Sequence, residues 1–267
     1  MVKNWMKACC LVAAMIGTAH AAQQTYVVGS GGTYRPFEFE NSQKQLEGFD
    51  IDIIKAIAKA EGFDIKLVNT PWEGIFATLS TGDRDIIISG ITITDKRKQM
   101  VDFSAPYFPA EQSIVVPADS KVTSLEALKS EKVGVVNSST GDIVVSDVLG
   151  KNSTSIKRFD NTPLMLQELF EDGVSAAVGD VGVVKYYIKQ HPEKQFKLVP
   201  DAKFERQYFG IAVAKGNSEL QAKINAGLQK IIADGTYAKI YKTWFDPPRP
   251  HRNKTHTCFH HGYRLWR

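Results

Sequence analysis

Three residues in the segment GITITDKR (90–97) have the chemistry needed to bind a carboxylate. The guanidinium of Arg97 can grip a carboxylate through two parallel hydrogen bonds, which an ammonium group cannot do. Thr92 offers a hydroxyl and a backbone N–H to the same anion, and Gly90 lets a ligand approach the backbone closely. An arginine between two lysines is often simply solvated. The position of Arg97 just past the apolar run 85–89 favours the binding role.

A second loop offers backbone groups that suit an anion. The segment NSSTGD (137–142) follows an apolar run and opens a helical pattern. N–H groups at the start of a helix bind anions, so Thr140 and Gly141 are candidates to close on the same carboxylate. Ordinary capping of the helix by Ser139 or Thr140 is the alternative role of this loop, and both roles are compatible.

Asp180, in the segment VGDV, carries the opposite charge at the end of another apolar run. Its carboxylate could hold an ammonium group, although an aspartate before a helix is also a common N-cap. A grip for a carboxylate and a separate grip for an ammonium group together predict an α-amino acid as the ligand. Tyr34 and Trp72 lie in loops after the first two expected strands, where aromatic rings either sandwich a ligand's side chain or close over their own core.

Other chemistries find little support in the sequence. GSGG (29–32) suggests a phosphate-binding loop, but no Gly-Lys-Ser/Thr follows and Pro36 replaces the required helix, so a nucleotide site is rejected. Residues 22–246 contain one histidine, His191, and no cysteine. Ser-His-Asp and Cys-His catalysis therefore have almost no residues to work with.

The candidate residues are positioned by a strand–helix alternation that occurs twice. The first unit has expected strands at 25–28, 65–68 and 85–89, and expected helices from Phe49 to Gly62 and over 75–79. The second has expected strands at 113–116, 132–136, 175–178 and 196–199, and helices that open at Thr123, span 142–149, open at Asn161 and span 181–190. This order predicts parallel sheets covered by helices, with ligands beyond the carboxyl ends of the strands.

The chain returns after the second unit through a strand within 208–214, and helices 218–233 and 236–244 follow. We therefore expect two lobes joined by two crossing segments, 107–111 and 205–209. The first lobe would comprise residues 22–108 and 209–246, and the second lobe residues 109–208. Two strands between lobes make a hinge, and hinge closure around a ligand is a common motion.

Both ends of the sequence differ from the rest. Residues 1–21 begin with Lys3 and Lys7, continue with an apolar run too short to span a bilayer, and end in Ala-His-Ala, which predicts a cleaved secretory signal and export to the periplasm. The segment 247–267 holds four of the six histidines and no acids. Its spacing is not that of a closed zinc site, and we expect a disordered extension, no metal and no cofactor.

The net charge of +4 also comes from these ends. Of the 33 basic residues, 2 lie in residues 1–21 and 5 in residues 247–267, which leaves 26 against all 29 acids. The body of the protein is therefore acidic by three charges, and a nucleic-acid partner is not expected.

Several motifs make the sequence resemble the bacterial extracellular solute-binding proteins of polar amino-acid ABC transporters (family 3), with the glutamine binders nearest. The motifs are YRPFEF (34–39), GFDIDI (48–53), GITITDKRK (90–98), VDFSAPY (101–107), SSTGD (138–142) and ADGTYAKIYKTWF (233–245). The resemblance covers roughly residues 25–245. It implies the α/β type II periplasmic-binding-protein fold, in which two lobes, each a mostly parallel sheet flanked by helices and joined by a two-strand hinge, close on one amino acid.

By matching position, the resemblance also implies roles for individual residues. Arg97 and Thr92 would hold the α-carboxylate with help from the backbones of Gly90 and Thr140, and Asp180 would hold the α-ammonium. The rest of the pocket would be lined by Ser89, Tyr34, Trp72, Asn137 and Gly141.

Three positions depart from the patterns of the family. Many members carry an acidic residue at the position of Gly31, where it reads the ligand's side chain. Its absence weakens the case for lysine or arginine and favours a glutamine-like side chain. Asn137 and Gly179 stand where the glutamine binders have a lysine and a histidine, so glutamine itself stays open.

We therefore expect a monomeric, non-enzymatic periplasmic receptor that delivers a polar amino acid to a membrane-embedded ABC permease. One rival is a periplasmic dehydratase of the cyclohexadienyl or arogenate type on the same fold, which needs a carboxyl with a raised pKa as general acid; Glu38 and Glu205 are the candidates. A second rival, the sensing domain of a membrane receptor, is disfavoured because no membrane-spanning stretch follows residue 245.

Overall fold

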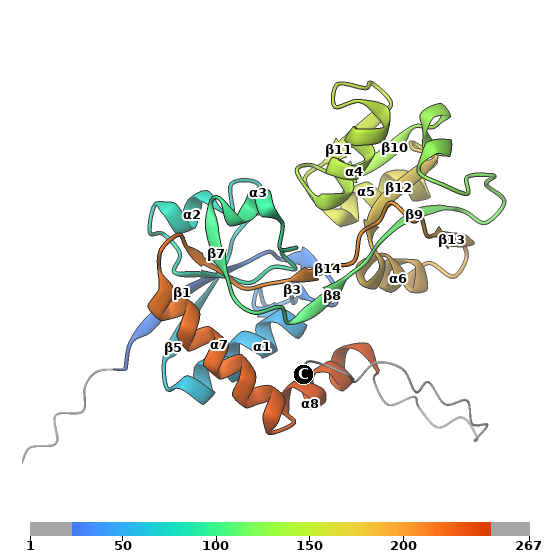
Figure 1. Cartoon of the computed structure of the whole chain (residues 1–267). Coiled ribbons are helices and arrows are strands. Elements are labelled where there is room, and N and C mark those ends of the chain that lie inside the picture. Colours follow the sequence, from blue (N-terminus) through green and yellow to red (C-terminus); the bar gives the residue numbers. More distant parts are fainter. Residues whose placement is uncertain (1–22, 247–267) are drawn as a thin grey trace, which may run out of the picture.

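The computed structural model describes residues 23–246, so the expected signal sequence and the histidine-rich segment 247–267 lie outside the described residues. The chain forms two lobes, each built around one five-stranded sheet (Figure 1). The α/β two-lobe architecture expected from the sequence is confirmed.

The first lobe has the strand order β5-β1-β6-β15-β7. Its strands are β1 (Thr25–Ser30), β5 (Asp64–Asn69), β6 (Ile86–Ile87), β7 (Val101–Phe103) and β15 (Ala212–Ala214). The second lobe has the order β11-β10-β12-β9-β13. Its strands are β9 (Gln112–Pro117), β10 (Val133–Val136), β11 (Ile156–Phe159), β12 (Ala176–Asp180) and β13 (Phe196–Val199).

In each sheet one strand runs against the other four. β15 pairs antiparallel with β6 and β7, and β9 pairs antiparallel with β12 and β13, whereas the remaining pairs are parallel. Each reversed strand is the one that enters its lobe from a crossing segment. The crossing segments contain β8 (Phe108–Ala110) and β14 (Gln207–Phe209), which pair antiparallel with Phe108 opposite Phe209 and form the two-strand hinge (Figure 1).

Helices cover both sheets. Those of the first lobe are α1 (Phe49–Glu61), α2 (Ala77–Ser80), α3 (Asp95–Lys98), α7 (Ser218–Ala233) and α8 (Thr236–Phe245). Those of the second are the 3-10 helix η1 (Glu126–Ser130), α4 (Thr140–Leu149), α5 (Thr162–Phe170) and α6 (Val181–Gln190). The expected helix at Thr123 thus begins three residues later, as a 3-10 turn in which the N–H of Leu128 donates to the carbonyl of Leu125 (3.1 Å).

Local sequence explains where the longer helices begin and end. In α1, Phe49, Ile53 and Ile57 are fully buried on one row, and the helix ends at Gly62 in the left-handed conformation (φ +70°) that glycine adopts without strain. In α5, the side chain of Asn161 accepts the N–H of Leu164 and caps the first turn. The α1 row packs into the core of the first lobe, so it anchors the loops that precede and follow it.

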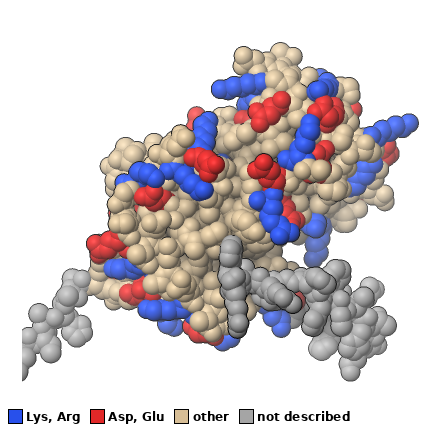
Figure 2. All heavy atoms as spheres, viewed as in Figure 1, with Lys and Arg blue, Asp and Glu red and all other residues tan. Residues whose placement is uncertain are grey.

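A small separate sheet that was not expected from the sequence consists of three short strands: β2 (Thr33–Tyr34), β3 (Glu38–Glu40) and β4 (Leu46–Glu47). This sheet follows β1 and carries residues 33–40 along the edge of the first lobe that faces the second. No helix between residues 23 and 246 is long and apolar enough to cross a membrane. On the face in Figure 2, basic and acidic side chains are interspersed, without the single-sign patch of a nucleic-acid binder.

Candidate ligand-binding site

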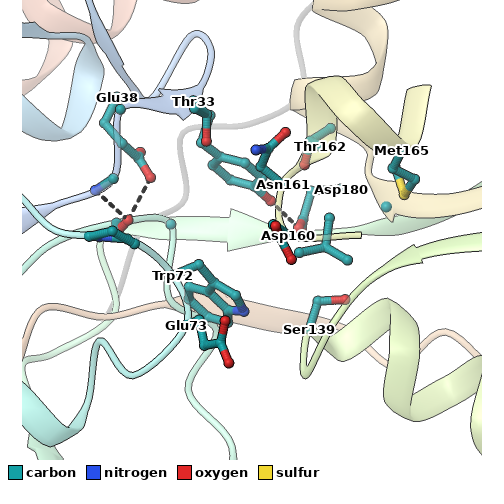
Figure 3. Close-up of a pocket in the computed structure, with 18 of the residues that line it drawn as sticks. Thr33, Glu38, Trp72, Glu73, Ser139, Asp160, Asn161, Thr162, Met165 and Asp180 are labelled. Atoms are coloured by element: carbon teal, nitrogen blue, oxygen red, sulfur yellow. Dashed lines mark hydrogen bonds between the residues drawn. The ribbon is translucent and has the colours of Figure 1, made fainter. Parts of the chain in front are cut away.

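A cavity of about 370 Å³ is lined by residues from both lobes, which is within the size range of small-molecule sites. It contains nine of the eleven residues expected from the sequence to bind a ligand: Gly31, Tyr34, Trp72, Ser89, Gly90, Thr92, Arg97, Thr140 and Asp180. Figure 3 shows Glu38 on one wall and Asp160 and Asp180 on the opposite wall, with Trp72 and Glu73 below them in this view.

Arg97 is buried (6% exposed) and faces the cavity rather than solvent. It lies in α3, whose first turn begins when the hydroxyl of Thr94 accepts the N–H of Arg97 (3.2 Å). The guanidinium donates to the carbonyl of Thr92 (2.9 Å) and, across the cleft, to that of Ser138 (3.4 Å). Burial lowers the pKa of Arg97 to about 10 and the charge of Asp180 opposes this effect, so the guanidinium is charged at neutral pH.

Asp180 stands before α6 but makes no capping hydrogen bond there. Its Oδ1 accepts from Nε2 of Gln112 (2.7 Å), and its Oδ2 accepts from the hydroxyl of Tyr34 in the other lobe (Figure 3). Burial raises the pKa of Asp180 to about 6, against the lowering effect of these two donors and of Arg97. The carboxyl group lines the cavity, and its charge when ionised is opposite to that of Arg97.

A chain of hydrogen bonds runs from the first loop to Glu38. The N–H of Gly31 donates to the hydroxyl of Ser89 (3.0 Å), which donates to Oε1 of Glu38 (2.7 Å). Glu38 is 1% exposed, and burial together with the neighbouring Asp50 raises its pKa well above the usual range. Figure 3 draws this pair of bonds on the wall that belongs to the first lobe.

Gly90 allows both Asp50 and the ring of Tyr34 to lie close to its backbone. Its backbone has φ +51°, and its N–H donates to Oδ2 of Asp50 (2.8 Å). A Cβ atom at this position would lie 2.6 Å from Cε1 of Tyr34. Any side chain here would therefore push Tyr34 away from Asp180 as well as strain the backbone.

The two remaining expected residues lie beside the cavity and not in its wall. The carbonyl of Asn137 accepts the indole N–H of Trp72 across the cleft (2.9 Å). A Cβ atom on Gly141 would lie 2.9 Å from the carbonyl oxygen of Val178, so the glycine allows α4 to pack closely on β12. The capping role considered for this loop is present, since the hydroxyl of Ser139 accepts the N–H of Asp142 (3.1 Å).

Sequence reasoning did not assign several polar residues that line the cavity. The wall also contains Glu40, Asn69, Glu73, Gln112, Asp160, Asn161 and Thr162. Asp160 and Asn161 follow β11, so the rule that ligands lie beyond strand ends would have found them had that strand been recognised. Glu38 was considered only as an acid for a dehydratase, and the other candidate for that role, Glu205, is exposed and does not line the cavity.

Metal binding finds no support in the part of the chain that the structure describes. Between residues 23 and 246, no group of three or more histidine, cysteine, aspartate or glutamate side chains is placed to hold a metal ion. The histidine cluster at 256–261 lies outside this range.

Comparison with known proteins decides the family. Residues 26–247 match the bacterial extracellular solute-binding proteins, family 3. The chain belongs to this family. The match spans nearly all of the described residues, so the resemblance drawn from the motifs is confirmed, as is the expectation of a binding protein rather than an enzyme.

Individual relatives of this solute-binding protein are similar along most of their length. A "probable histidine-binding protein" of Neisseria gonorrhoeae is 42% identical over 223 residues, which are 83% of each chain. The crystal structure of the arginine-, lysine-, histidine-binding protein ArtJ of Geobacillus stearothermophilus has a TM-score of 0.80 at 39% identity and covers 85% of this chain and 97% of its own. An ancestral arginine-binding protein bound to arginine has a TM-score of 0.79 at 44% identity, with 84% and 99% covered.

Proposed function

We propose that this solute-binding protein captures a cationic L-amino acid, of the arginine or histidine class, between its lobes and delivers it to an ABC permease. The observation that carries the proposal is the charge of the cavity wall. Among the described residues, Arg97 is the one basic residue in the wall, which also contains five acids: Glu38, Glu40, Glu73, Asp160 and Asp180.

The amino-acid head group accounts for only two of these charges. Its carboxylate pairs with Arg97, supported by Thr92 and by Thr140 at the first turn of α4. Its ammonium group pairs with Asp180. The four remaining acids then line the space left for the ligand's side chain, where a cation is a better partner for acidic groups than a neutral amide.

The position of Glu38 bears on the sequence argument that favoured glutamine. That argument rested on Gly31, which lacks the acidic side chain found at this position in many family members. A Cβ atom on Gly31 would lie only 3.7 Å from Oε1 of Glu38. The carboxyl group of Glu38 thus stands beside the place where the side chain of residue 31 would begin, and we infer that it supplies the missing acid. The names of the relatives, which refer to histidine, arginine and lysine, support a cationic ligand.

The ligand enters and leaves by rotation of the lobes about β8 and β14, with the second lobe spanning residues 109–208. Among the described residues, four hydrogen bonds join the lobes in the present conformation: from Tyr34 to Asp180, from Trp72 to Asn137, from Arg97 to Ser138 and from Tyr187 to Thr33. Opening breaks these bonds, and a bound amino acid compensates them by bridging Arg97 and Asp180. The protein acts in the periplasm as a monomer, after removal of residues 1–21.

A ligand screen tests the proposal. Ligand-free protein is heated in the presence of arginine, histidine, lysine, glutamine or glutamate. A ligand at 100 times its dissociation constant adds about 2.7 kcal/mol to the free energy of unfolding, so a binder raises the melting temperature clearly. We expect arginine or histidine to give the largest rise and glutamate none. A larger rise with glutamine than with any cationic amino acid contradicts the proposal.

A further inference from the structure

Glu38 has a second acidic neighbour that does not line the cavity. Asp50, in the first turn of α1, is fully buried and neighbours Glu38, because the two carboxyl groups accept hydrogen bonds from the consecutive residues Gly90 and Ser89. Each group keeps one oxygen without a partner among the described residues, Oε2 of Glu38 and Oδ1 of Asp50. Neither group forms an ion pair with a described lysine, arginine or histidine. Two carboxyl groups in contact without a cation cannot both ionise, so they hold a proton between them.

The donors around the pair decide which group keeps the proton. Oδ2 of Asp50 accepts two hydrogen bonds, from the N–H of Gly90 (2.8 Å) and the hydroxyl of Tyr107 (2.9 Å). Oε1 of Glu38 accepts one, from Ser89 (2.7 Å). Asp50, with a pKa raised by burial to about 6, is therefore the carboxylate at neutral pH. Glu38, whose pKa burial and Asp50 raise well above the usual range, is the neutral acid.

The other titratable groups that bear on this pair come from four further elements. They are Tyr34 of β2, Tyr107 between β7 and β8, Tyr187 of α6 and Asp180 of β12. None of them carries a positive charge, so none of them can take the place of the proton. The side of Glu38 that lines the cavity is open to a ligand. A cation that arrives from the cavity is therefore the group able to displace this proton.

We propose that an arginine-type ligand binds by exchanging the cation of its side chain for the proton shared by Glu38 and Asp50, and that this exchange selects cationic over neutral amino acids. The inference rests on the proposed function, because it requires the ligand's side chain to lie against Glu38. A neutral side chain leaves the proton in place. Arginine releases one proton to solvent for each molecule bound.

The exchange predicts a pH dependence with a definite sign. The complex with arginine holds one proton fewer than the free protein. The association constant for arginine therefore rises about tenfold per pH unit at pH values where Glu38 is protonated in the free protein, and it levels off at higher pH. The association constant for glutamine lacks this dependence and varies with pH only through Asp180, whose pKa is raised to about 6. Asp180 faces the ammonium group of both ligands, so any proton it contributes cancels in the comparison. Arginine is the probe, because the imidazole of histidine itself titrates.

Titration calorimetry in two buffers of different ionisation enthalpy measures the protons released. We expect one proton per arginine and none per glutamine at neutral pH. Glu38→Gln abolishes the release with arginine, whereas Glu205→Gln, the same change at an exposed position outside the cavity, leaves it at one. Asp50→Asn removes the charge that keeps Glu38 protonated, so the release falls and the rise in affinity shifts to lower pH.

The outcomes separate this inference from the proposed function. If arginine binds without releasing a proton, or if Glu38→Gln releases as many protons as the wild type, the exchange is overturned. The proposal that the ligand is a cationic amino acid is then unaffected. The wild-type measurement needs no variant, so a variant that fails to fold does not prevent the test. If arginine and histidine do not bind at all, the proposed function fails, and the exchange fails with it.

Discussion

The hydroxyl of Tyr34 donates to Oδ2 of Asp180, so a residue of one lobe holds the carboxylate of the other. Asp180 is also the group that we assign to the ammonium of an amino acid. In the ligand-free protein the carboxylate thus accepts a hydrogen bond from a neutral hydroxyl. In the complex the ammonium group of the ligand is a stronger donor, because it is charged. The bond helps to close the cleft, and it leaves the second oxygen of Asp180 to Gln112.

Tyr34→Phe removes this donor and keeps the ring. We expect the ligand-free protein to open further, because one of the four hydrogen bonds between the lobes is lost, and its radius of gyration in solution scattering to increase. Arginine affinity should change by less than about tenfold, since a single hydrogen bond contributes about 0.5–1.5 kcal/mol net. Tyr186→Phe is the matched control, because the hydroxyl of Tyr186 has no hydrogen bond among the described residues. An unchanged radius of gyration in Tyr34→Phe contradicts the closing role.

Gly90→Ala tests whether the position of Tyr34 depends on the missing side chain beneath it. The added Cβ would meet Cε1 of Tyr34 at 2.6 Å, and the backbone at φ +51° would be strained. We expect a loss of about 1–3 kcal/mol in the free energy of unfolding and at least a tenfold loss in arginine affinity. Gly62 also has a positive φ (+70°), but a Cβ atom there would meet no atom within 4 Å. Gly62→Ala should therefore reduce stability without reducing arginine affinity. Equal affinity losses in the two variants would show that strain, not the contact with Tyr34, is responsible.

Much of this arrangement could be predicted from the sequence. The period of Phe49, Ile53 and Ile57 identified α1, and the apolar runs that precede Gly90, Asn137 and Asp180 located three loops around the cavity. The rule that ligands lie beyond the carboxyl ends of strands was enough to bring Arg97, Thr92, Thr140 and Asp180 together.

The parts that were missed have physical reasons. β2 and β4 have two residues each, and β7 has three, too short to show a period of two. β11 exposes Lys157 and Arg158 in succession and so does not alternate, which hid Asp160 and Asn161. Glu38 was not predicted to bind the ligand, because its proposed role depends on its proximity to Asp50 and Gly31. The fold brings these residues together, and no local sequence pattern indicates such a contact.

Arg97→Ala should abolish the grip on the ligand's carboxylate. Leaving one partner of a buried charge pair alone costs about 2–5 kcal/mol, so arginine affinity is expected to fall at least thirtyfold in calorimetry. Arg97→Lys keeps the charge but loses the planar fork, and should still lose about tenfold. The unfolding free energy of the Ala variant should fall by about 1–3 kcal/mol, because the carbonyl of Thr92 loses its donor.

Lys98→Ala is the control for Arg97. Lys98 is the next residue in α3, but its ammonium group pairs with Asp95 (3.1 Å) at the surface, where such pairs contribute little. Its affinity for arginine should match the wild type. If Arg97→Ala binds as tightly as Lys98→Ala, Arg97 does not belong to the site.

The raised pKa values of Asp180 and Asp50 predict how the stability of the ligand-free protein depends on pH. Burial raises both pKa values to about 6, whereas an aspartate in an unfolded chain has a pKa of about 3.9. Between these values the folded protein binds more protons than the unfolded chain, so the free energy of unfolding falls as pH rises through this window. Each group should contribute a loss of about 1 kcal/mol between pH 5 and pH 7.

Urea unfolding of ligand-free protein at the two pH values measures this loss. Asp180→Asn removes the contribution of Asp180, so the variant should lose less stability than the wild type over the same interval, with the contributions of Asp50 and of Glu38, whose pKa is also raised, remaining. Saturating arginine should reduce the loss in the wild type as well, because the ligand's ammonium group compensates the charge of Asp180 at pH 7. A variant that keeps the full wild-type dependence would mean that Asp180 is ionised as easily in the folded cleft as in the unfolded chain. Its carboxylate would then not be the desolvated group that the ammonium requires.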